Sequence, residues 1–421
     1  MKQFVIIGNS AAGLSAVEAI RSRDKDSKII VLSDEEHPSY CRCLISYYLA
    51  GDVKKEKILY RPESFYKDNN IELILNKKVT RVDPKKNRIV CQDKSAFDYD
   101  SLLIATGASP KFPDTKGIKK TGVFGFRTLK NTMDIDGLLA VTKSACVLGG
   151  GLVGLKVAYA LKKRGVDVKV IVRSNQVLSQ ILDPEAAGLV KKKLEDNGIE
   201  VVLGEGVSEI IGEEKEIKAV KLDSGKAIGA SLVIVGKGVS PNIDLVKNTD
   251  IKTGMGIISG NTLATNIENI YTAGDCAESF DLTLGKLAVN ALWPVAVEQG
   301  KVAGSNMAGE KIQYDGSVAM NSLEFFGLPT VSLGIYNLKD LQGYLELKTY
   351  DRGANVYKKV VLQNNLLVGA VLVGNINSSG LFLKLIRERI DVSTLRDKLL
   401  EDNFGYPDIM DLVKDKEKLY V

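Results

Sequence analysis

The chain has 421 residues, of which 45 % are hydrophobic, so it is long enough for roughly two to four domains with buried cores. Its 57 basic and 52 acidic residues are spread along the sequence and give a net charge of +5. Such a surface suits an acidic partner protein, but it lacks the concentrated basic stretches of nucleic-acid-binding proteins. No stretch of about 18 apolar residues predicts a membrane span, and no signal-peptide pattern precedes the first strand. We therefore expect a cytoplasmic protein.

The cysteine and histidine content limits the metal-binding and catalytic sites that the chain can form. The five cysteines include no CxxC pair, and His37 is the single histidine. We therefore predict no metal site and no Ser-His-Asp hydrolase, because each needs more ligands or bases than the sequence offers. The hard chemistry is expected to belong to a bound cofactor.

The chain opens with a βαβ pattern. An apolar strand at residues 4–7 leads through a glycine-bounded turn into a helix at 11–21, and a second strand follows at 28–32. This order is typical of a doubly wound parallel sheet. Further along, residues 98–106 read as one buried strand that runs into the segment ATGASP.

The same pattern recurs about 140 residues later. A strand at 145–148 is followed by a helix at 153–164 and a strand at 168–172, and another strand at 231–235 ends in GKGVSPN, which contains Gly238. The chain is therefore predicted to hold two nucleotide-binding units. Beyond residue 310 the pattern changes to alternating strands at 356–362 and 367–373 and a helix at 380–387, which indicates a third, α+β domain.

The first glycine loop is GNSAAG, from Gly8 to Gly13. Gly8 permits the tight turn and Gly13 permits close packing of helix against strand, while Ser10 replaces the usual middle glycine. A pyrophosphate would lie on the helix N-terminus, next to Ala11 and Ala12, although any tight βα turn could have this form.

Residues after the second strand supply charge to this loop. The strand ends in LSDE, and we select Glu35, with Asp34 as the alternative, to accept hydrogen bonds from a ribose. Arg42, in the following loop, offers a cation to a pyrophosphate or flavin, unless it is a simple surface arginine.

The ordered set GNSAAG, SDE, YCRCLISYYLAG, ATGASP, GGGLVG and TNIENIYTAGDCAE resembles the FAD-dependent pyridine nucleotide–disulfide oxidoreductase superfamily, over nearly the whole chain. The NADH:rubredoxin reductases and the flavin domain of nitrite reductases are the most similar branch. The resemblance implies two Rossmann-like domains of the glutathione-reductase type and a small α+β C-terminal domain. It also implies that Asp275, after Gly274, binds the FAD ribitol; here it is expected to follow a strand at 270–272 and to precede a helix. The other implied FAD contacts are Val79, Ala105, Thr106, Gly107 and Trp293, with Trp293 starting a helix.

The second loop, GGGLVG, is a full G-x-G-x-x-G that follows a strand and opens a helix. In a flavoprotein this context predicts an NAD(P) site, formed by Gly149, Gly151, Leu152, Val153 and Gly154. The residue where a ribose-binding acid is usual is Val172, and Arg173 follows it. An acid favours NAD and an arginine accommodates the 2′-phosphate of NADP, so the choice stays open, with NAD preferred on family grounds.

Two residues are candidates for a catalytic role. Lys156 stands where many relatives carry a glutamate near the flavin, and its charge would stabilise reduced flavin unless it points to solvent. Cys43 matches the redox cysteine of the NADH oxidase, NADH peroxidase and CoA-disulfide reductase branch, and Arg42 would lower its pKa. Against this, Ser10 replaces the histidine of the peroxidases, and a Cys41–Cys43 disulfide would be strained, so a packing role is favoured. Cys91, Cys146 and Cys276 are interpreted as core residues.

The resulting hypothesis is an FAD enzyme that exchanges a hydride with NAD(P)H and electrons with a rubredoxin or ferredoxin-like protein. The direction of flow stays open, as does the choice between a homodimer and a hetero-complex. One alternative is a flavin–cysteine enzyme that reduces CoA disulfide, polysulfide or peroxide; the other is a non-catalytic nucleotide-binding subunit. The predicted segments are an FAD-binding domain at 1–111, an NAD(P)-binding domain at 112–240, the rest of the FAD-binding domain at 241–310, and a C-terminal domain at 311–421.

Overall fold

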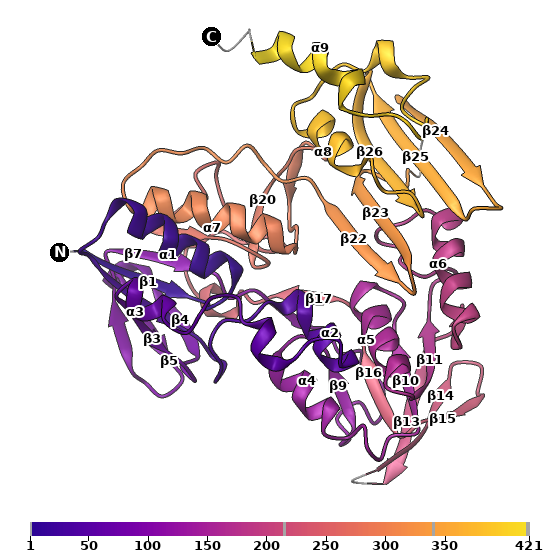
Figure 1. Cartoon of the computed structure of the whole chain (residues 1–421). Coiled ribbons are helices and arrows are strands. Elements are labelled where there is room, and N and C mark those ends of the chain that lie inside the picture. Colours follow the sequence, from indigo (N-terminus) through magenta and orange to yellow (C-terminus); the bar gives the residue numbers. More distant parts are fainter. Residues whose placement is uncertain (1, 214–215, 339–341, 418–421) are drawn as a thin grey trace. The chain divides into compact units, whose positions relative to one another are not determined.

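The computed structural model describes residues 2–213, 216–338 and 342–417. It divides into two compact units, each built from separate stretches of the chain (Figure 1). Unit 1 contains residues 1–110, 127–129 and 239–317, and unit 2 contains 111–126, 130–238 and 318–421. The three predicted domain boundaries stay predictions, and each unit is described by itself.

A five-stranded parallel sheet forms the centre of unit 1, with strand order β19-β7-β1-β2-β3. Its strands are β1 (Gln3–Ile7), β2 (Lys28–Leu32), β3 (Ile71–Ile74), β7 (Ser101–Ile104) and β19 (Ile270–Thr272). The expected first βαβ pattern is confirmed, because β1 and β2 pair in parallel across α1 (Ala11–Arg23). The expected strand at 98–106 is wrong in extent. β6 (Ala96–Asp98) belongs to a separate antiparallel sheet with β4 (Val79–Asp83) and β5 (Arg88–Cys91), so the chain changes sheet before β7 begins.

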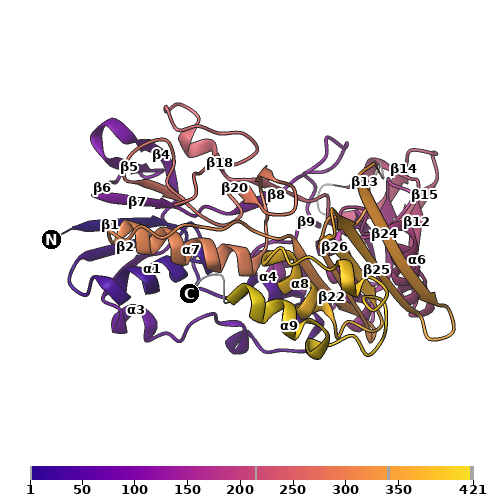
Figure 2. The ribbon, with the colours of Figure 1, turned by 90° about the horizontal axis from the view of Figure 1, so that it is seen from above.

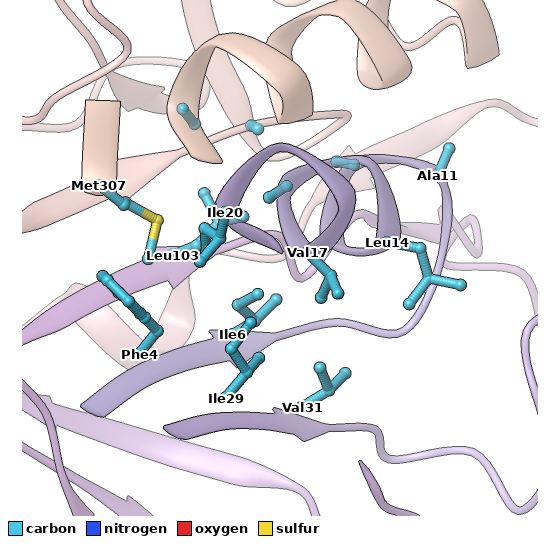
Figure 3. Packing of buried hydrophobic residues seen from close by; sticks show 14 of the residues in the cluster. Phe4, Ile6, Ala11, Leu14, Val17, Ile20, Ile29, Val31, Leu103 and Met307 are labelled. Atoms are coloured by element: carbon cyan, nitrogen blue, oxygen red, sulfur yellow. The ribbon is translucent and has the colours of Figure 1, made fainter. Parts of the chain in front are cut away.

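Alternation along β1 explains how this sheet is covered on both faces. Phe4 and Ile6 lie in a buried cluster with residues of α1 and α7 (Trp293–Met307), shown in Figure 3. Val5 and Ile7 lie in a second buried cluster that includes residues of β4 and β5. Successive strand residues point to opposite faces, so this run of apolar residues is typical of a strand buried on both sides.

Small residues bring α1 and α7 together, and the two helices run side by side in Figures 1 and 2. A Cβ added at Gly300 would lie 2.2 Å from the Ala12 carbonyl oxygen, and one at Gly304 would lie 2.4 Å from the Ala16 carbonyl oxygen. Only glycine permits backbones this close, so α7 holds the helix that carries the first glycine loop.

Shorter elements complete unit 1. Two further sheets are antiparallel β8 with β17, and β18-β20-β21. The remaining bounds are β8 (Ala108–Pro110), β17 (Val239–Pro241), β18 (Ile257–Ile258), β20 (Ala277–Asp281), β21 (Lys286–Ala288), α2 (Ile45–Ala50) and α3 (Phe65–Asp68).

Unit 2 repeats the doubly wound pattern. Its parallel sheet has the order β12-β11-β10-β16-β9, with β9 (Val123–Gly125), β10 (Ser144–Leu148), β11 (Asp167–Val172), β12 (Ile199–Leu203) and β16 (Leu232–Val235). The helices are α4 (Leu129–Asp136), which begins at the last residue of the unit 1 segment, α5 (Leu152–Lys163) and α6 (Pro184–Asp196). An antiparallel sheet adds β13 (Val207–Glu213), β14 (Glu216–Leu222) and β15 (Ala227–Gly229). The second predicted βαβ unit is confirmed.

The predicted C-terminal α+β domain is also present. Five antiparallel strands take the order β22-β23-β26-β25-β24, and α8 packs against β23 and β26 (Figure 1). The bounds are β22 (Met320–Phe325), β23 (Leu328–Gly334), β24 (Tyr344–Asp351), β25 (Val356–Gln363), β26 (Leu366–Val373), α8 (Ser379–Arg387) and α9 (Tyr406–Glu417).

A buried polar cluster joins this sheet to α6 of the same unit. Asp183 caps α6 by accepting a hydrogen bond from the backbone N–H of Ala186 at 3.0 Å. The same carboxylate accepts one from the Tyr357 hydroxyl at 2.9 Å, and the Lys359 ammonium lies 3.6 Å from it. Asp183 and Lys359 are both buried, and Lys359 also forms an ion pair with Glu346 at 2.7 Å, so neither buried charge is left without compensation.

Candidate functional site: two dinucleotide cradles

The first glycine loop follows β1 and is held by direct backbone contact. Gly8 has a φ of +124°, and a Cβ there would lie 2.1 Å from the Ala105 carbonyl oxygen. A Cβ at Gly13 would lie 1.9 Å from the Gly8 carbonyl oxygen. Ser10 is the N-cap of α1 and makes no side-chain capping bond, and the first turn of this helix carries no acidic residue. The helix N-terminus therefore presents its positive end without a carboxylate, as an anion-binding turn requires.

Buried polar atoms around the loop fit a large polar ligand. Among the described residues, Asn9 Nδ2 and Ser39 Oγ are buried and have no hydrogen-bond partner. Asn9 Oδ1 accepts a hydrogen bond from the Tyr66 hydroxyl at 2.9 Å, and that hydroxyl accepts one from the Ser39 N–H at 3.0 Å. Buried donors normally have partners, so donors left over beside a glycine loop suit the oxygens of a pyrophosphate and ribitol. The residues present therefore fit FAD.

The predicted Glu35 and Arg42 are brought together by a residue that sequence reasoning missed. The Tyr40 hydroxyl donates to Glu35 Oε2 at 2.6 Å and accepts from Arg42 Nη1 at 3.1 Å. It also accepts from the Leu129 backbone N–H at 2.8 Å, and Arg42 forms an ion pair with Glu35. Burial raises the pKa of Tyr40, so its hydroxyl remains neutral and keeps donating. Asp34, the alternative acceptor, is exposed.

Asp275 pairs with Arg127, a residue that no local sequence pattern marks as part of the site. Arg127 Nη2 donates to Asp275 Oδ2, and the Arg127 carbonyl accepts from Arg42 Nη1 at 3.0 Å. The expectation that Asp275 precedes a helix is wrong, because β20 follows it and the next helix is α7. The flanking Gly274, with a φ of +80°, donates its N–H to the buried Gln299 side chain at 2.7 Å.

Several other predicted FAD contacts lie at strand ends of unit 1. Ala105 directly follows β7, and the Thr106 hydroxyl donates to the Asn242 carbonyl at 2.6 Å. Gly107 has a φ of +67°. Val79 begins β4, and Trp293 begins α7 as predicted. Their contacts with FAD stay predictions.

Cys41 and Cys43 flank Arg42 at the start of a short 3₁₀ turn. Both are free thiols; Cys43 is exposed and Cys41 half-buried. A hydrogen bond between them lowers the pKa of Cys41 and raises the pKa of Cys43, on which the charges of Arg127 and Asp275 also act. The expectation that Arg42 lowers the pKa of Cys43 is wrong, because the hydrogen bond from Cys41 and burial raise that pKa. The redox role of Cys43 stays a prediction. The core interpretation of the other three cysteines is confirmed, because all three are buried: Cys91, Cys146 and Cys276.

The second glycine loop is held by the same kind of close backbone contacts as the first. Gly149 has a φ of +121°, and a Cβ there would lie 2.3 Å from the Gly236 carbonyl oxygen. A Cβ at Gly154 would lie 2.3 Å from the Gly149 carbonyl oxygen. Gly151 is the N-cap of α5, whose first turn, beginning with Leu152 and Val153, carries no acidic residue.

Beside this loop lies a cavity of about 770 Å³ within unit 2. Gly149 and Gly150 line it together with the end of β11, at Val172 and Arg173. Arg173 forms an ion pair with Asp223 at 3.1 Å. Lys237, the residue directly before Gly238, also lines the cavity. A cavity at the carboxyl ends of parallel strands is the usual place for a dinucleotide in such folds.

Lys156 lies on α5 and contacts the C-terminal sheet. Its ammonium donates to the Glu324 carbonyl at 3.3 Å and lies 5.3 Å from the centroid of the Phe325 ring. The alternative of a lysine that only faces solvent is therefore wrong. Its action on the flavin stays a prediction.

The described residues contain no group of three or more His, Cys, Asp or Glu side chains that could hold a metal ion. Within the same ranges, none of the helices combines the length and apolar composition needed to cross a lipid bilayer. The chain thus has two glycine loops, one whose surroundings fit FAD and one beside a cavity suited to a second dinucleotide. This combination is typical of oxidoreductases that bind two dinucleotides.

The comparisons agree with this class. A family model described as "Pyridine nucleotide-disulphide oxidoreductase" matches residues 2–300, and one described as "Rubredoxin NAD+ reductase C-terminal domain" matches residues 320–390. The chain therefore belongs to the pyridine nucleotide–disulphide oxidoreductase family, as the sequence resemblance predicted, and it is an oxidoreductase that uses FAD and NAD(P)H.

Individual relatives extend over most of the chain. An NADH oxidase of Methanocaldococcus jannaschii is 35 % identical over 93 % of this chain and 90 % of its own length. A nitrite reductase [NAD(P)H] of Bacillus subtilis is 34 % identical over 93 % of this chain, which spans 48 % of that protein. The solved structure of an NAD-dependent persulfide reductase from A. fulgidus has a TM-score of 0.88 and 26 % identity, covering 99 % of this chain and 84 % of that one.

Proposed function

We propose that the chain passes a hydride between NAD(P)H and FAD and exchanges electrons between FAD and a small iron–sulfur protein of the rubredoxin or ferredoxin type. The observation that carries this proposal is the C-terminal segment, residues 320–390, which matches the C-terminal domain model of rubredoxin NAD+ reductases. The mildly basic net charge of +5 supports it, because it favours association with an acidic partner. We expect the protein to act in the cytoplasm.

Bound FAD would allow a two-electron hydride transfer to be coupled to the transfer of single electrons. The residues of unit 1 would hold the FAD. Gly8 and Gly13 keep the loop compact so that the first turn of α1 can meet a pyrophosphate. Asp275 and Glu35 offer carboxylate acceptors to hydroxyl groups, with Arg127 and Arg42 as their present partners. These roles follow from the donors and acceptors each residue carries.

Unit 2 would hold the nicotinamide dinucleotide. The N-terminus of α5, free of acidic residues in its first turn, suits the coenzyme pyrophosphate. The cavity beside Gly149 and Gly150 suits its adenosine half. Most of the rate advantage is then expected from alignment and charge rather than from protein acid–base groups.

A second candidate function is reduction of disulfide, persulfide or polysulfide through Cys43. The observation that favours it is the pair of free thiols on either side of Arg42, of which Cys43 is exposed. Similarity to a persulfide reductase structure supports the same reading. Such a pair would be a plain packing feature in an enzyme that reduces only iron–sulfur proteins.

One panel of assays separates these functions. Purified protein is reduced anaerobically with NADH while the flavin absorbance is followed, and is then mixed with rubredoxin, with ferredoxin or with CoA disulfide. The main proposal predicts fast rubredoxin or ferredoxin reduction that Cys43→Ser leaves within about twofold. Loss of all acceptor reduction in Cys43→Ser, with the flavin retained, would establish the thiol function instead. Flavin that NADH does not bleach would contradict both and leave a non-catalytic subunit.

A further inference from the structure

The excess positive charge of the chain comes from one short segment. Residues 76–94 contain seven basic and two acidic side chains, which together give the +5 net charge of the whole chain. The other residues contain basic and acidic side chains in equal numbers. The expectation of an evenly spread charge is therefore wrong for this segment.

The segment forms most of the antiparallel sheet β4-β5-β6 in unit 1. The inner face of this sheet is apolar, because Val79, Val82 and Ile89 are buried in the cluster that also contains Val5 and Ile7. Figure 2 shows the sheet on the side of the parallel sheet away from α1 and α7. Successive strand residues point to opposite faces, so the polar side chains of β4 and β5 lie on the outer face, toward solvent.

Exposed cations lie along the whole length of this outer face. Arg81 lies in β4, and Lys85 and Lys86 lie in the short 3₁₀ turn between β4 and β5. At the other end of the strands, Lys78 precedes β4 and Lys94 lies in the turn after β5. All five side chains are exposed, and together they define the basic sheet face. A five-residue strand such as β4 is about 17 Å long, so these cations cover a surface rather than a single point.

Carboxylates of the chain compensate only part of this positive charge. Lys77 forms an ion pair with Asp93, and Arg88 forms one with Asp98 at 2.5 Å. No carboxylate of the described residues lies within ion-pair distance of the five cations of the basic sheet face. Five uncompensated cations on one face produce a positive potential, which attracts and orients a surface of opposite charge.

The composition of this face favours a protein partner over a nucleic acid or a membrane. Single-stranded nucleic acids stack on exposed aromatic side chains, and membrane surfaces are held by apolar side chains that insert between the lipids. Among the described residues, none of the large hydrophobic side chains that are exposed lies in β4, β5 or β6. A folded acidic protein needs neither feature, because its carboxylates can pair with the cations across a polar interface.

We propose that the basic sheet face docks an acidic protein, which presents several carboxylates to the five cations. The docking surface is separate from the redox chemistry, because none of these cations belongs to either glycine loop. Binding of the acidic protein therefore does not depend on which electron acceptor the enzyme uses.

The test uses the purified flavoprotein and fluorescently labelled poly-L-glutamate as the acidic probe. Fluorescence anisotropy gives the dissociation constant at low ionic strength and at about 0.15 M salt. Lys85→Glu/Lys86→Glu reverses two charges of the basic sheet face. Lys25→Glu/Lys301→Glu is the matched control, because it changes the net charge equally and both lysines are exposed on the α1–α7 side of the parallel sheet. Carbodiimide cross-linking with peptide mass spectrometry then locates the bound probe, because this reagent joins lysine amines to carboxylates.

Wild-type protein should bind polyglutamate at low ionic strength and more weakly at about 0.15 M salt, because salt screens exposed charges. Lys85→Glu/Lys86→Glu should weaken binding at least about tenfold, because two favourable charge pairs become repulsive. The control should change the dissociation constant by less than about threefold, because its charges lie on another face. Cross-links should form at Lys78, Lys85, Lys86 and Lys94 of the wild type. Both variants should keep their flavin and its reduction by NADH.

Three results would overturn the inference. The first is an equal loss of polyglutamate binding in both variants, and the second is a spread of cross-links over all exposed lysines. The third is a wild type that does not bind polyglutamate, including the case in which phosphatidylserine vesicles or single-stranded RNA bind to this face instead. Failure of the proposed function is distinguishable, because flavin that NADH does not reduce would leave these binding measurements intact.

Discussion

Replacing Gly300 by alanine tests whether α1 is held in place by its contact with α7. An alanine Cβ at this position would lie 2.2 Å from the Ala12 carbonyl oxygen, about 1.2 Å short of ordinary contact. The obstacle is backbone rather than a flexible side chain, so the helices have to move apart. Forcing extra atoms into a packed interface costs about 1–3 kcal/mol. Alanine in a helix interior regains about 1 kcal/mol, so we expect a net loss of up to about 2 kcal/mol.

The same substitution at Gly188 is the matched control. Gly188 lies on α6, is exposed, and has no atom within 4 Å of an added Cβ. Gly188→Ala should therefore stabilise its helix by about 0.5–1 kcal/mol. The two variants contain the same chemical change, and their stabilities are predicted to shift in opposite directions and to differ by about 0.5–3 kcal/mol.

Hydrogen exchange with mass spectrometry resolves the helices separately, because local stability differs across a structure. Gly300→Ala should speed exchange in peptides from α1 and α7 and should also speed release of flavin, since Ala12 lies in the first turn of α1. Gly188→Ala should slow exchange in α6 alone. If Gly300→Ala stabilises α1 and α7 as the control stabilises α6, the close packing of these helices does not restrain the first glycine loop.

Three further predictions concern single groups. Tyr40→Phe should cost about 1–3 kcal/mol in urea unfolding, because the buried Leu129 N–H loses its acceptor. Cys41, whose pKa is lowered by its bond to Cys43, should react with iodoacetamide at lower pH than Cys43, and its labelling should fall as the pH drops through its pKa; peptide mass spectrometry that finds Cys43 labelled first would refute this. Gly151→Ser should fold normally, as judged by circular dichroism, yet weaken NADH binding in calorimetry, because only the Gly236 carbonyl, at 3.9 Å, lies near its Cβ position.

Much of the fold could be predicted because the sequence patterns that indicate it are local. The strands β1, β2, β10 and β11 are short apolar runs beside glycine turns, and their pairing follows from the right-handed crossover that βαβ units share. The strand expected at 98–106 shows the limit. Hydrophobicity marks residues as buried, but it does not reveal that the chain leaves one sheet at Asp98 and joins another at Ser101.

The site was less accessible to sequence reasoning where it depends on distant residues. Glu35 and Arg42 stand seven residues apart and were predicted, but Tyr40, which joins them, was not, because no local pattern shows that its hydroxyl contacts both side chains. Arg127 lies 148 positions from Asp275, and no spacing rule connects them. A helix was expected after Asp275 because of the family resemblance and because a turn after a parallel strand usually leads into a helix. In this chain β20 follows instead.

The two glycine loops show which glycines the fold itself requires. At the first position, Gly8 and Gly149 each leave space for a carbonyl of the neighbouring strand end, and both take φ values near +120°. The third glycines, Gly13 and Gly154, each leave space for the carbonyl of the first glycine in the same loop. The middle position is different, because Gly151 has protein atoms no nearer than 3.9 Å to its Cβ position. Protein packing therefore dictates the outer glycines and leaves the middle position unrestricted. This explains why Ser10 can occupy that position in the first loop without disturbing the turn.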